Sequence, residues 1–550
     1  MRLGTLFVVV AACGRAGFGT ESGDAGPRTG LRATISAATG LAVAELDARL
    51  TFAALDPDQL YALPAQGGPP ALPLETVLAL PDMSGPLTLT LDAVDTRGRE
   101  LSTVAMTTIT VDHIQTVDVT IGSDLPATCL DGVVDAGESD VDCGGPCPLC
   151  GIGSACTGPA SCASGTCATS ACEPASGPPA WLPIKDMPLA RIGPGVALGG
   201  DGIVYVYGGA LADSTPAYTE VDAYDPTTNM WSAAPPLATA SYRMAYAADS
   251  NGAVYAIGGA TGGGSLLATV ERFTPGMAQW TALLPLPTAL GSLAGASDAN
   301  GSVYAIGGTT SSGVPGEIDA FGGAWVTDTA MPTPRTNLAA ARATNGTIVV
   351  VGGHDSGDSV HYATAEAFDP ATNAWTELPA MNVARSDLAA ATGGDGRVYA
   401  ISGYDGSLPN PVVEAYRTNA PGWVGVASLS IGRDTCSATA TADGRIIVFG
   451  GKMGGAAAYA SAEAYGPHVA LTAQTGAPGD KIIASGQNFA AMATVRVYFD
   501  AMPVELATTD ANGVLAGVDV IVPALASGAH VVKLVDDRSF YAITLPFTIE

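Results

Sequence analysis

Eight cysteines are concentrated in residues 129–172, a stretch with almost no large apolar side chains. A stretch of this composition cannot build a hydrophobic core, so disulfides or a metal ion must hold it together. The CxxxCxxC spacing at 143–150 would suit zinc, but the number of cysteines is even and no His lies among them. Four disulfides are therefore predicted, and the pairing stays open. The cysteines are Cys129, Cys143, Cys147, Cys150, Cys156, Cys162, Cys167 and Cys172.

The same stretch carries closely spaced carboxylates, the hard oxygen ligands that Ca²⁺ prefers. Val133 and Val141 stand where an EF-hand loop would need oxygen ligands, so a solvated acidic turn is favoured and a calcium site is the alternative. The string CLDGVVDAGESDVDCGGPCPLC resembles a Cys-rich motif in surface proteins of predatory and other soil bacteria. No other cofactor is predicted. The candidate calcium ligands are Asp131, Asp135, Glu138, Asp140 and Asp142.

Residues 1–13 have the pattern of an export signal: a short charged start, an apolar run that ends at Ala12, and then Cys13. The sequence Val-Ala-Ala-Cys at 10–13 resembles the bacterial lipobox, which implies that Cys13 is lipidated and becomes the mature N-terminus. An ordinary short signal peptide is the alternative. Gly14 after the cysteine implies sorting to the outer membrane. Residues 14–31 are rich in Gly, Ser and Thr, which predicts a flexible tether.

The chain is strongly acidic, with 23 Lys+Arg against 52 Asp+Glu and a formal net charge of −29. A polyanion gains no counterion-release energy from nucleic acid and is repelled by anionic lipid headgroups. Nucleic-acid binding is therefore not expected, and contact with a membrane is expected only through the N-terminal lipid anchor. After residue 13 no uninterrupted apolar stretch approaches the ~18–20 residues that span a bilayer.

The elements that would position any functional group are set by a repeat of about fifty residues, which indicates one supersecondary unit copied six times. Each unit has an apolar run that ends in a glycine pair or its Ser-Gly equivalent, and in every unit but the last a Trp follows further on. The glycines are Gly208, Gly209, Gly258, Gly259, Gly307, Gly308, Gly352, Gly353, Gly403, Gly450 and Gly451, with Ser402 in the remaining position. The tryptophans are Trp181, Trp231, Trp280, Trp325, Trp375 and Trp423.

Within each unit, an Asp-Gly or Asn-Gly pair before the apolar run predicts a tight hairpin, and a third strand ends in an aromatic residue. This arrangement resembles the kelch motif, six times over, and the resemblance implies a six-bladed β-propeller across residues 180–467. Trp181 precedes the first glycine pair, whereas Tyr465, the last of the third-strand aromatics, has no Trp after it. The strand at Trp181 is therefore expected to complete the last sheet and close the ring.

Each unit also places charged residues at regular positions. Since the positions repeat, Arg–carboxylate pairs in the scaffold are favoured, and a ring of carboxylates around a cation channel is the alternative. The acids, two residues before each third-strand aromatic, are Asp222, Glu271, Asp319, Glu366, Glu414 and Glu463. The arginines assigned to the start of the units are Arg191, Arg243, Arg335, Arg385 and Arg433, with Leu290 in the third unit.

Two further β-rich regions flank the repeat, so the predicted fold class is all-β. Residues 32–124 alternate apolar and polar residues in short runs, which predicts a small Ig-like β-sandwich. In residues 469–550 the order SGQNF, VRVYF and Val522-Pro523 resembles IPT/TIG domains, which implies a second Ig-like sandwich. The Cys-rich segment, 129–172, lies between the first sandwich and the propeller.

Candidate catalytic chemistry is sparse. The histidines are scattered along the chain. Some kelch propellers are copper radical oxidases, which need clustered Tyr and His and a Cys beside a Tyr, and the neighbours of Cys436 offer no such cluster. No hydrolase, metalloprotease or phosphate-loop motif fits either. The sequence therefore predicts a lipid-anchored, exported, non-enzymatic binding or adhesion protein, in the outer membrane or on the cell surface. Propeller loops such as 210–219, 260–268, 309–316, 354–362 and 404–411 would recognise a protein or glycan.

The alternative function is a periplasmic carbohydrate-active propeller enzyme such as a sugar mutarotase, which would need a central pocket with converging Arg and carboxylate groups. A central channel filled by small apolar side chains, with an exposed patch on the loops, would favour the binding protein.

Overall fold

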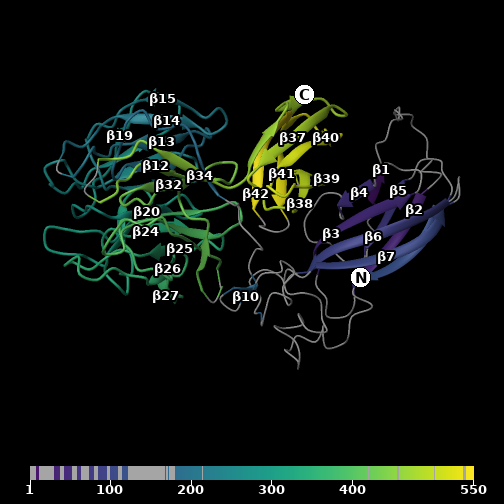
Figure 1. Ribbon diagram of the computed structural model, residues 1–550, viewed down its shortest axis with the longest axis horizontal. Coiled ribbons are helices and arrows are strands. Elements are labelled where there is room, and N and C mark those ends of the chain that lie inside the picture. The colour runs from purple at the N-terminus through teal and green to yellow at the C-terminus, as the bar shows by residue number, and fades with distance from the viewer. Residues whose placement is uncertain are drawn as a thin grey trace.

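The computed structural model describes the strands before residue 122, Cys156, two short strands near residue 170, and residues 180–550 except 214, 419, 421, 455–456, 501 and 537–540. All regular elements among these residues are β-strands (Figure 1). No helix in this part of the chain is long and apolar enough to cross a membrane.

Six four-stranded antiparallel sheets lie between Trp181 and Tyr465, arranged as in a β-propeller (Figure 1). We call them blades, in chain order. Blade 1 contains β12 (Gly195–Leu198), β13 (Val204–Tyr207), β14 (Val221–Asp225) and β15 (Met230–Ala234). Blade 2 contains β16 (Ala245–Ala248), β17 (Val254–Ile257), β18 (Val270–Phe273) and β19 (Thr281–Ala282). Blade 3 contains β20 (Ala294–Ser297), β21 (Val303–Ile306), β22 (Ile318–Phe321) and β23 (Trp325–Thr327). Blade 4 contains β24 (Ala339–Arg342), β25 (Ile348–Val351), β26 (Ala365–Asp369) and β27 (Ala374–Leu378). Blade 5 contains β28 (Ala389–Thr392), β29 (Val398–Ile401), β30 (Val413–Tyr416) and β31 (Val424–Val426). Blade 6 contains β32 (Ser437–Ala440), β33 (Ile446–Phe449), β34 (Ala462–Tyr465) and β11 (Trp181–Pro183).

The first strands of successive blades contact one another around a closed ring, because β32 of blade 6 contacts β12 of blade 1. The outer strand of blade 6 comes from the other end of the array: β11 pairs with β34, with Trp181 opposite Tyr465. The two rings stack with their centroids 5.0 Å apart. This is the pairing that the sequence predicts for Trp181, the tryptophan that precedes the first glycine pair.

The glycine pairs join each blade to the next. The second residue of the pair donates its backbone N–H to a carbonyl at the start of the following blade, as in Gly209 to Ser241 (2.9 Å) and Gly451 to Arg191 (2.8 Å). The first residue adopts a left-handed conformation, and a Cβ on Gly208 would lie 2.4 Å from the Ser241 carbonyl oxygen. Glycine is therefore required by both the backbone angle and the close approach.

Each Trp makes a second connection between blades. Its indole N–H donates to the carbonyl of the residue four positions after the preceding blade's Trp, at 2.7–3.0 Å. Trp181 follows the same rule, because it donates to Ala427, four residues after Trp423. Each Trp ring also packs on the third-strand aromatic of its own blade.

The N-terminal strands form two four-stranded sheets, in the orders β1-β5-β2-β8 and β4-β3-β6-β7. Their bounds are β1 (Val8–Ala11), β2 (Gly30–Ala37), β3 (Val43–Phe52), β4 (Gln59–Ala62), β5 (Leu74–Ala79), β6 (Gly85–Asp95), β7 (Glu100–Ile109) and β8 (Ile114–Ile121). The structure thus pairs Val8–Ala11, part of the predicted export signal, with β5. Cys13 lies outside the described residues.

Little of the Cys-rich segment is described. Strands β9 (Cys167–Ala168) and β10 (Ala171–Cys172) form a small hairpin, and Cys156 is disulfide-bonded. The five candidate calcium ligands and the other five cysteines of this segment lie outside the described residues.

The C-terminal region forms a three-stranded sheet, β35-β37-β40, and a five-stranded sheet, β36-β42-β41-β38-β39. The bounds are β35 (His468–Leu471), β36 (Thr475–Gly476), β37 (Lys481–Gln487), β38 (Thr494–Phe499), β39 (Met502–Thr508), β40 (Leu515–Ile521), β41 (Gly528–Asp536) and β42 (Ala542–Ile549). The core between the two sheets is continuous with that of blades 5 and 6. Tyr541 donates to the Gly444 carbonyl (2.9 Å) in the β32–β33 turn, and a Cβ on Gly394 in the β28–β29 turn would meet the Ala542 carbonyl.

Replacing Trp181 with Ala is expected to destabilise the whole propeller, because it removes a buried ring, its stacking on Tyr465 and the hydrogen bond to Ala427. The expected loss in the free energy of unfolding is about 3–5 kcal/mol. Urea denaturation monitored by fluorescence would measure it. Trp325→Ala, at a half-buried Trp inside the array, is the matched control and should cost less. Equal losses, or no loss for Trp181→Ala, would contradict closure through β11.

Candidate functional site

Six residues with left-handed backbone angles form a ring at the mouth of the central channel. They are Gly193, Arg243, Ser292, Asn337, Asp387 and Thr435, with φ between 50° and 53°. Each donates its backbone N–H to the carbonyl of the corresponding residue in the preceding blade, at 2.8–2.9 Å, and Gly193 closes the circle by donating to Thr435. A left-handed angle is unfavourable for a β-branched residue such as Thr435, so the closed ring of hydrogen bonds must hold it there.

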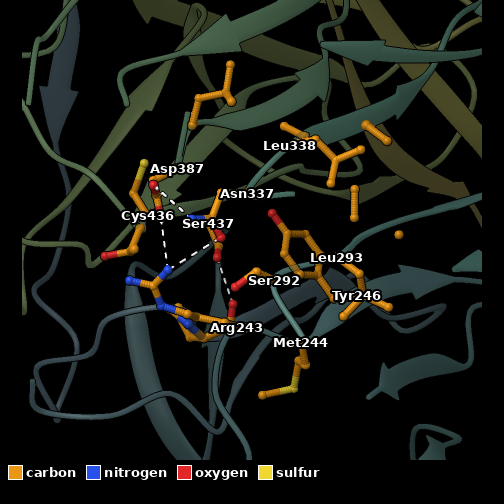
Figure 2. A pocket seen from close by; sticks show the side chains of 18 residues that line it. Arg243, Met244, Tyr246, Ser292, Leu293, Asn337, Leu338, Asp387, Cys436 and Ser437 are labelled. Carbon is orange, nitrogen blue, oxygen red and sulfur yellow. Dashed lines mark hydrogen bonds and ion pairs between the residues drawn. The ribbon is translucent and has the colours of Figure 1, made fainter. Parts of the chain in front are cut away.

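Three side chains of this ring converge (Figure 2). The Arg243 guanidinium donates to Asp387 (3.1 Å) and makes a long contact with Asn337 (3.4 Å), while the Asn337 amide donates to the other oxygen of Asp387 (3.2 Å). Arg243 also pairs with Asp213 (3.2 Å), in the β13–β14 loop, and Asp213 pairs in turn with Lys452. Burial alone would lower the pKa of Arg243, but the carboxylates of Asp387 and Asp213 raise it.

The assignment of Arg243 to the repeated arginines is wrong. The true repeat position lies seventeen residues before the first residue of each glycine pair, and in blade 2 it is occupied by Ser241. Arg243 lies two residues later, in the ring at the mouth. Counting back fifteen residues from each glycine pair would have identified all six ring positions from the sequence. The sequence did not predict the convergence of Arg243, Asn337 and Asp387, because the residue types at these positions differ from blade to blade.

The four remaining repeat arginines pair with the acid of their own blade. The pairs are Arg191–Asp222 (2.5 Å), Arg335–Glu366 (3.2 Å), Arg385–Glu414 (2.5 Å) and Arg433–Glu463 (2.6 Å). All four guanidinium side chains are fully buried. In blade 2, Glu271 instead accepts from the backbone N–H groups of Ala238 and Thr239, both at 2.8 Å. These acids therefore brace the blades from inside, as the scaffold interpretation predicts, and do not face a cation channel.

Blade 3 departs from this pattern because Leu290 replaces the arginine. Its acid, Asp319, accepts from the Thr327 hydroxyl (2.6 Å), and burial raises the pKa of Asp319.

The cavity beneath the ring is small. Its volume is about 70 Å³, and Figure 2 shows the side chains that line it, among them Tyr246, Ser292, Leu293 and Leu338. Sites for small organic ligands generally measure about 300–1,000 Å³. Small residues of the first strands, such as Ala294 and Gly295 of β20 and Ala339 and Ala340 of β24, complete the lining. The cavity is about large enough for one or two water molecules.

A buried carboxylate lies beside this mouth. Asp434 is 6% exposed and accepts from the Thr435 hydroxyl at 3.1 Å. Burial, with the nearby charge of Asp387, raises its pKa to about 6, although Lys452 and Arg243 act in the opposite direction.

The histidines of blade 4 lie next to the ring. His354 Nε2 is 3.0 Å from the Asn337 amide nitrogen, and His361 Nδ1 is 3.2 Å from the Ser386 hydroxyl, which donates to Asp387. The described residues include no group of three His, Cys, Asp or Glu side chains that could hold a metal ion. Cys436 is free and buried, and burial raises the pKa of its thiol to about 12, so it is not a nucleophile near neutral pH.

The loops on the mouth side of the propeller expose large aliphatic side chains. These loops connect the second and third strands of each blade. The segments that lead to the first strand of the next blade lie on the same side. The C-terminal sheets contact the turns between first and second strands, which lie at the opposite ends of the strands. The mouth side is therefore not covered by them. The exposed side chains are Leu211, Val360, Leu408, Ile431 and Met453.

Comparison with known proteins supports the repeat. Residues 335–382 match the family model described as Kelch motif. No curated protein matches the chain. Among solved structures, the chain is similar to one titled "Novel fungal alcohol oxidase with catalytic diversity among the AA5 family, in complex with copper", with 12% identity, a TM-score of 0.43, and coverage of 68% of this chain and 99% of that one. That similarity is too distant to bear on cofactors.

Replacing Asp434 with Asn is expected to stabilise the protein at high pH but not at low pH. Because the folded-state pKa of Asp434 is raised from 3.8 to about 6, the folded state binds more protons than the unfolded state between these values, so stability falls as the pH rises. A shift of about 2 pKa units corresponds to about 3 kcal/mol.

Urea denaturation at about pH 4 and about pH 8 measures the effect, with the gain appearing only at the higher pH. Asp405→Asn is the control and should show no gain, because backbone hydrogen bonds lower the pKa of Asp405. The same stability change for Asp434→Asn at both pH values would refute the assignment.

Proposed function

We propose that this chain is a cell-envelope lipoprotein, anchored through Cys13, whose six-bladed kelch propeller binds a protein partner without catalysing a reaction. In this proposal the N-terminal sheets and the C-terminal IPT/TIG-like sandwich are spacers, and the Cys-rich segment is stapled by disulfides. The protein is displayed on the outer membrane or cell surface. Kelch propellers commonly mediate protein–protein contact, and a glycan is the alternative ligand to be tested.

The observation that carries the proposal is the uncovered loop face. Leu211, Leu408 and Met453 are 47%, 64% and 47% exposed, and each lies in a loop of this one face. Exposed aliphatic side chains gathered on one face of a folded protein are typical of interaction sites. Rigid strands position the loops, while the residues at the loop tips differ between blades, which suits recognition.

The charged mouth supports binding over catalysis. Arg243 is neutralised by Asp387 and Asp213, so its charge is already satisfied within the protein. The cavity of about 70 Å³ is too small for a monosaccharide.

Replacing Leu211, Leu408 and Met453 together with Ser is expected to abolish capture of the partner by the full chain, because the apolar contact area is lost. Capture from envelope extracts, with glycan-array binding in parallel, provides the readout. Met230, Met277 and Val326 are similarly exposed, at 58%, 60% and 59%, but none lies in a mouth-side loop. Replacing these three with Ser is the matched control and should leave capture intact. Equal binding by both triple variants would refute the proposal.

The second candidate function is the carbohydrate-active enzyme, and one observation favours it: Arg243, Asn337 and Asp387 converge at the mouth. If this is a sugar mutarotase, the protein should speed anomer exchange of a sugar as measured by NMR, and Arg243→Ala should remove that activity. No acceleration over the uncatalysed rate would eliminate this candidate.

A further inference from the structure

Three of the five exposed aliphatic side chains of the loop face lie in the loops of blades 4 and 5 and in the segment that follows blade 5. Val360 is 51% exposed at the tip of the β25–β26 loop, Leu408 is 64% exposed at the tip of the β29–β30 loop, and Ile431 is 43% exposed in the segment before β32. The two loops are in contact, because the rings of His361 and Tyr404 are 5.4 Å apart. Gly432 packs against the Pro409 carbonyl, so Ile431 lies beside the second loop. We call this surface the apolar arc.

Two carboxylates hold the tips of the arc in fixed turns. Asp355 accepts from the backbone N–H groups of Ser359 (2.9 Å) and Val360 (3.2 Å). Asp405 accepts in the same way from Ser407 and Leu408, both at 2.9 Å. The aliphatic side chains are therefore presented on ordered turns, and ordering them on binding costs little conformational entropy.

The charge around the arc has one sign. Residues 352–364 and 402–412 contain Asp355, Asp358 and Asp405 but no Lys or Arg. Asp358 is 65% exposed, and the basic atoms within 4.0 Å of its carboxylate in the described part of the chain are the Nε2 atoms of His354 and His361, at 3.6 and 3.9 Å. The backbone hydrogen bonds lower the pKa of both Asp355 and Asp405, so these two stay ionised in mildly acidic conditions. The arginines of the adjoining segments, Arg385 and Arg433, are buried in their ion pairs.

We propose that the apolar arc binds a protein segment in which aliphatic residues are flanked by Lys or Arg. The inference rests on the proposed binding function and specifies its partner. The aliphatic groups of the segment would cover Val360, Leu408 and Ile431. Its cations would meet Asp355, Asp358 and Asp405, and such charge complementarity selects the partner and raises its association rate.

The probe is a short, fluorescently labelled peptide of leucine and lysine, titrated with the full chain and followed by anisotropy. We expect binding that weakens as salt rises from about 0.05 to about 0.5 M. Changing Asp355, Asp358 and Asp405 together to Asn should weaken it by about tenfold. Asn keeps the acceptor oxygen of each turn, so these loops should stay folded, and circular dichroism would verify it. Val360→Ser with Leu408→Ser should also weaken binding about tenfold.

The matched control changes Asp225, Asp369 and Asp510 to Asn, which removes the same charge from three turns that are capped in the same way but lie outside the arc. This control should bind the peptide like the parent chain. Equal binding of a leucine–glutamate peptide, an equal loss in the control, or no loss in the two arc variants would overturn the inference.

The proposed function is judged separately. If the full chain captures its partner through Leu211, Leu408 and Met453 but ignores the leucine–lysine peptide, the inference fails and the proposed function stands. If the ligand captured through this face is a glycan, the inference also fails. If neither partner nor peptide binds, both fail.

Discussion

The ring of blades depends on one contact, the hydrogen bond from the second residue of each glycine pair to the first segment of the next blade. Six such bonds, at 2.8–3.0 Å, close on themselves from Gly451 back to Arg191. They need a left-handed turn directly after a fully buried strand, and at the glycine of blade 1, for example, an added Cβ would lie 2.4 Å from the Ser241 carbonyl oxygen. Blade 5 forms the same left-handed turn with Ser402, whose hydroxyl oxygen lies 2.6 Å from the Asn410 carbonyl oxygen and 2.8 Å from the Arg433 carbonyl oxygen. The tryptophans and the arginine pairs reinforce an order that this contact establishes.

This constraint also explains why variable residues can gather at the mouth. The backbone ring from Gly193 to Thr435 needs only N–H and C=O groups, so the residue types at its six positions are free to differ. Three of them, Arg243, Asn337 and Asp387, hydrogen-bond to one another. The loops beyond them are equally free, since each is anchored at both ends by strands. The proposed binding face therefore lies on a part of the molecule whose residues can change without cost to the core.

The two faces of the propeller differ in what covers them. The C-terminal sheets pack on turns of blades 5 and 6 and share a continuous apolar core with these blades. The mouth face keeps its exposed aliphatic side chains and, around the apolar arc, the carboxylates of Asp355, Asp358 and Asp405. The Coulomb field of a chain with net charge −29 favours cationic partners in general, and in our proposal the exposed aliphatic side chains of the apolar arc add apolar contact to this attraction.

The periodic features could be predicted from the sequence, because hydrophobic runs, glycine pairs and spaced aromatics are local signals repeated in phase. They indicated the strands, the all-β class and the pairing of Trp181 with the last unit. The register of Arg243 could not be read from residue type, since four other units also carry an Arg near their start and only the distance to the glycine pair separates the two positions. Which side chains meet across the channel was decided by the tertiary structure alone: Arg243 and Asp387 are 144 residues apart, and only closure of the ring brings them within 3.1 Å.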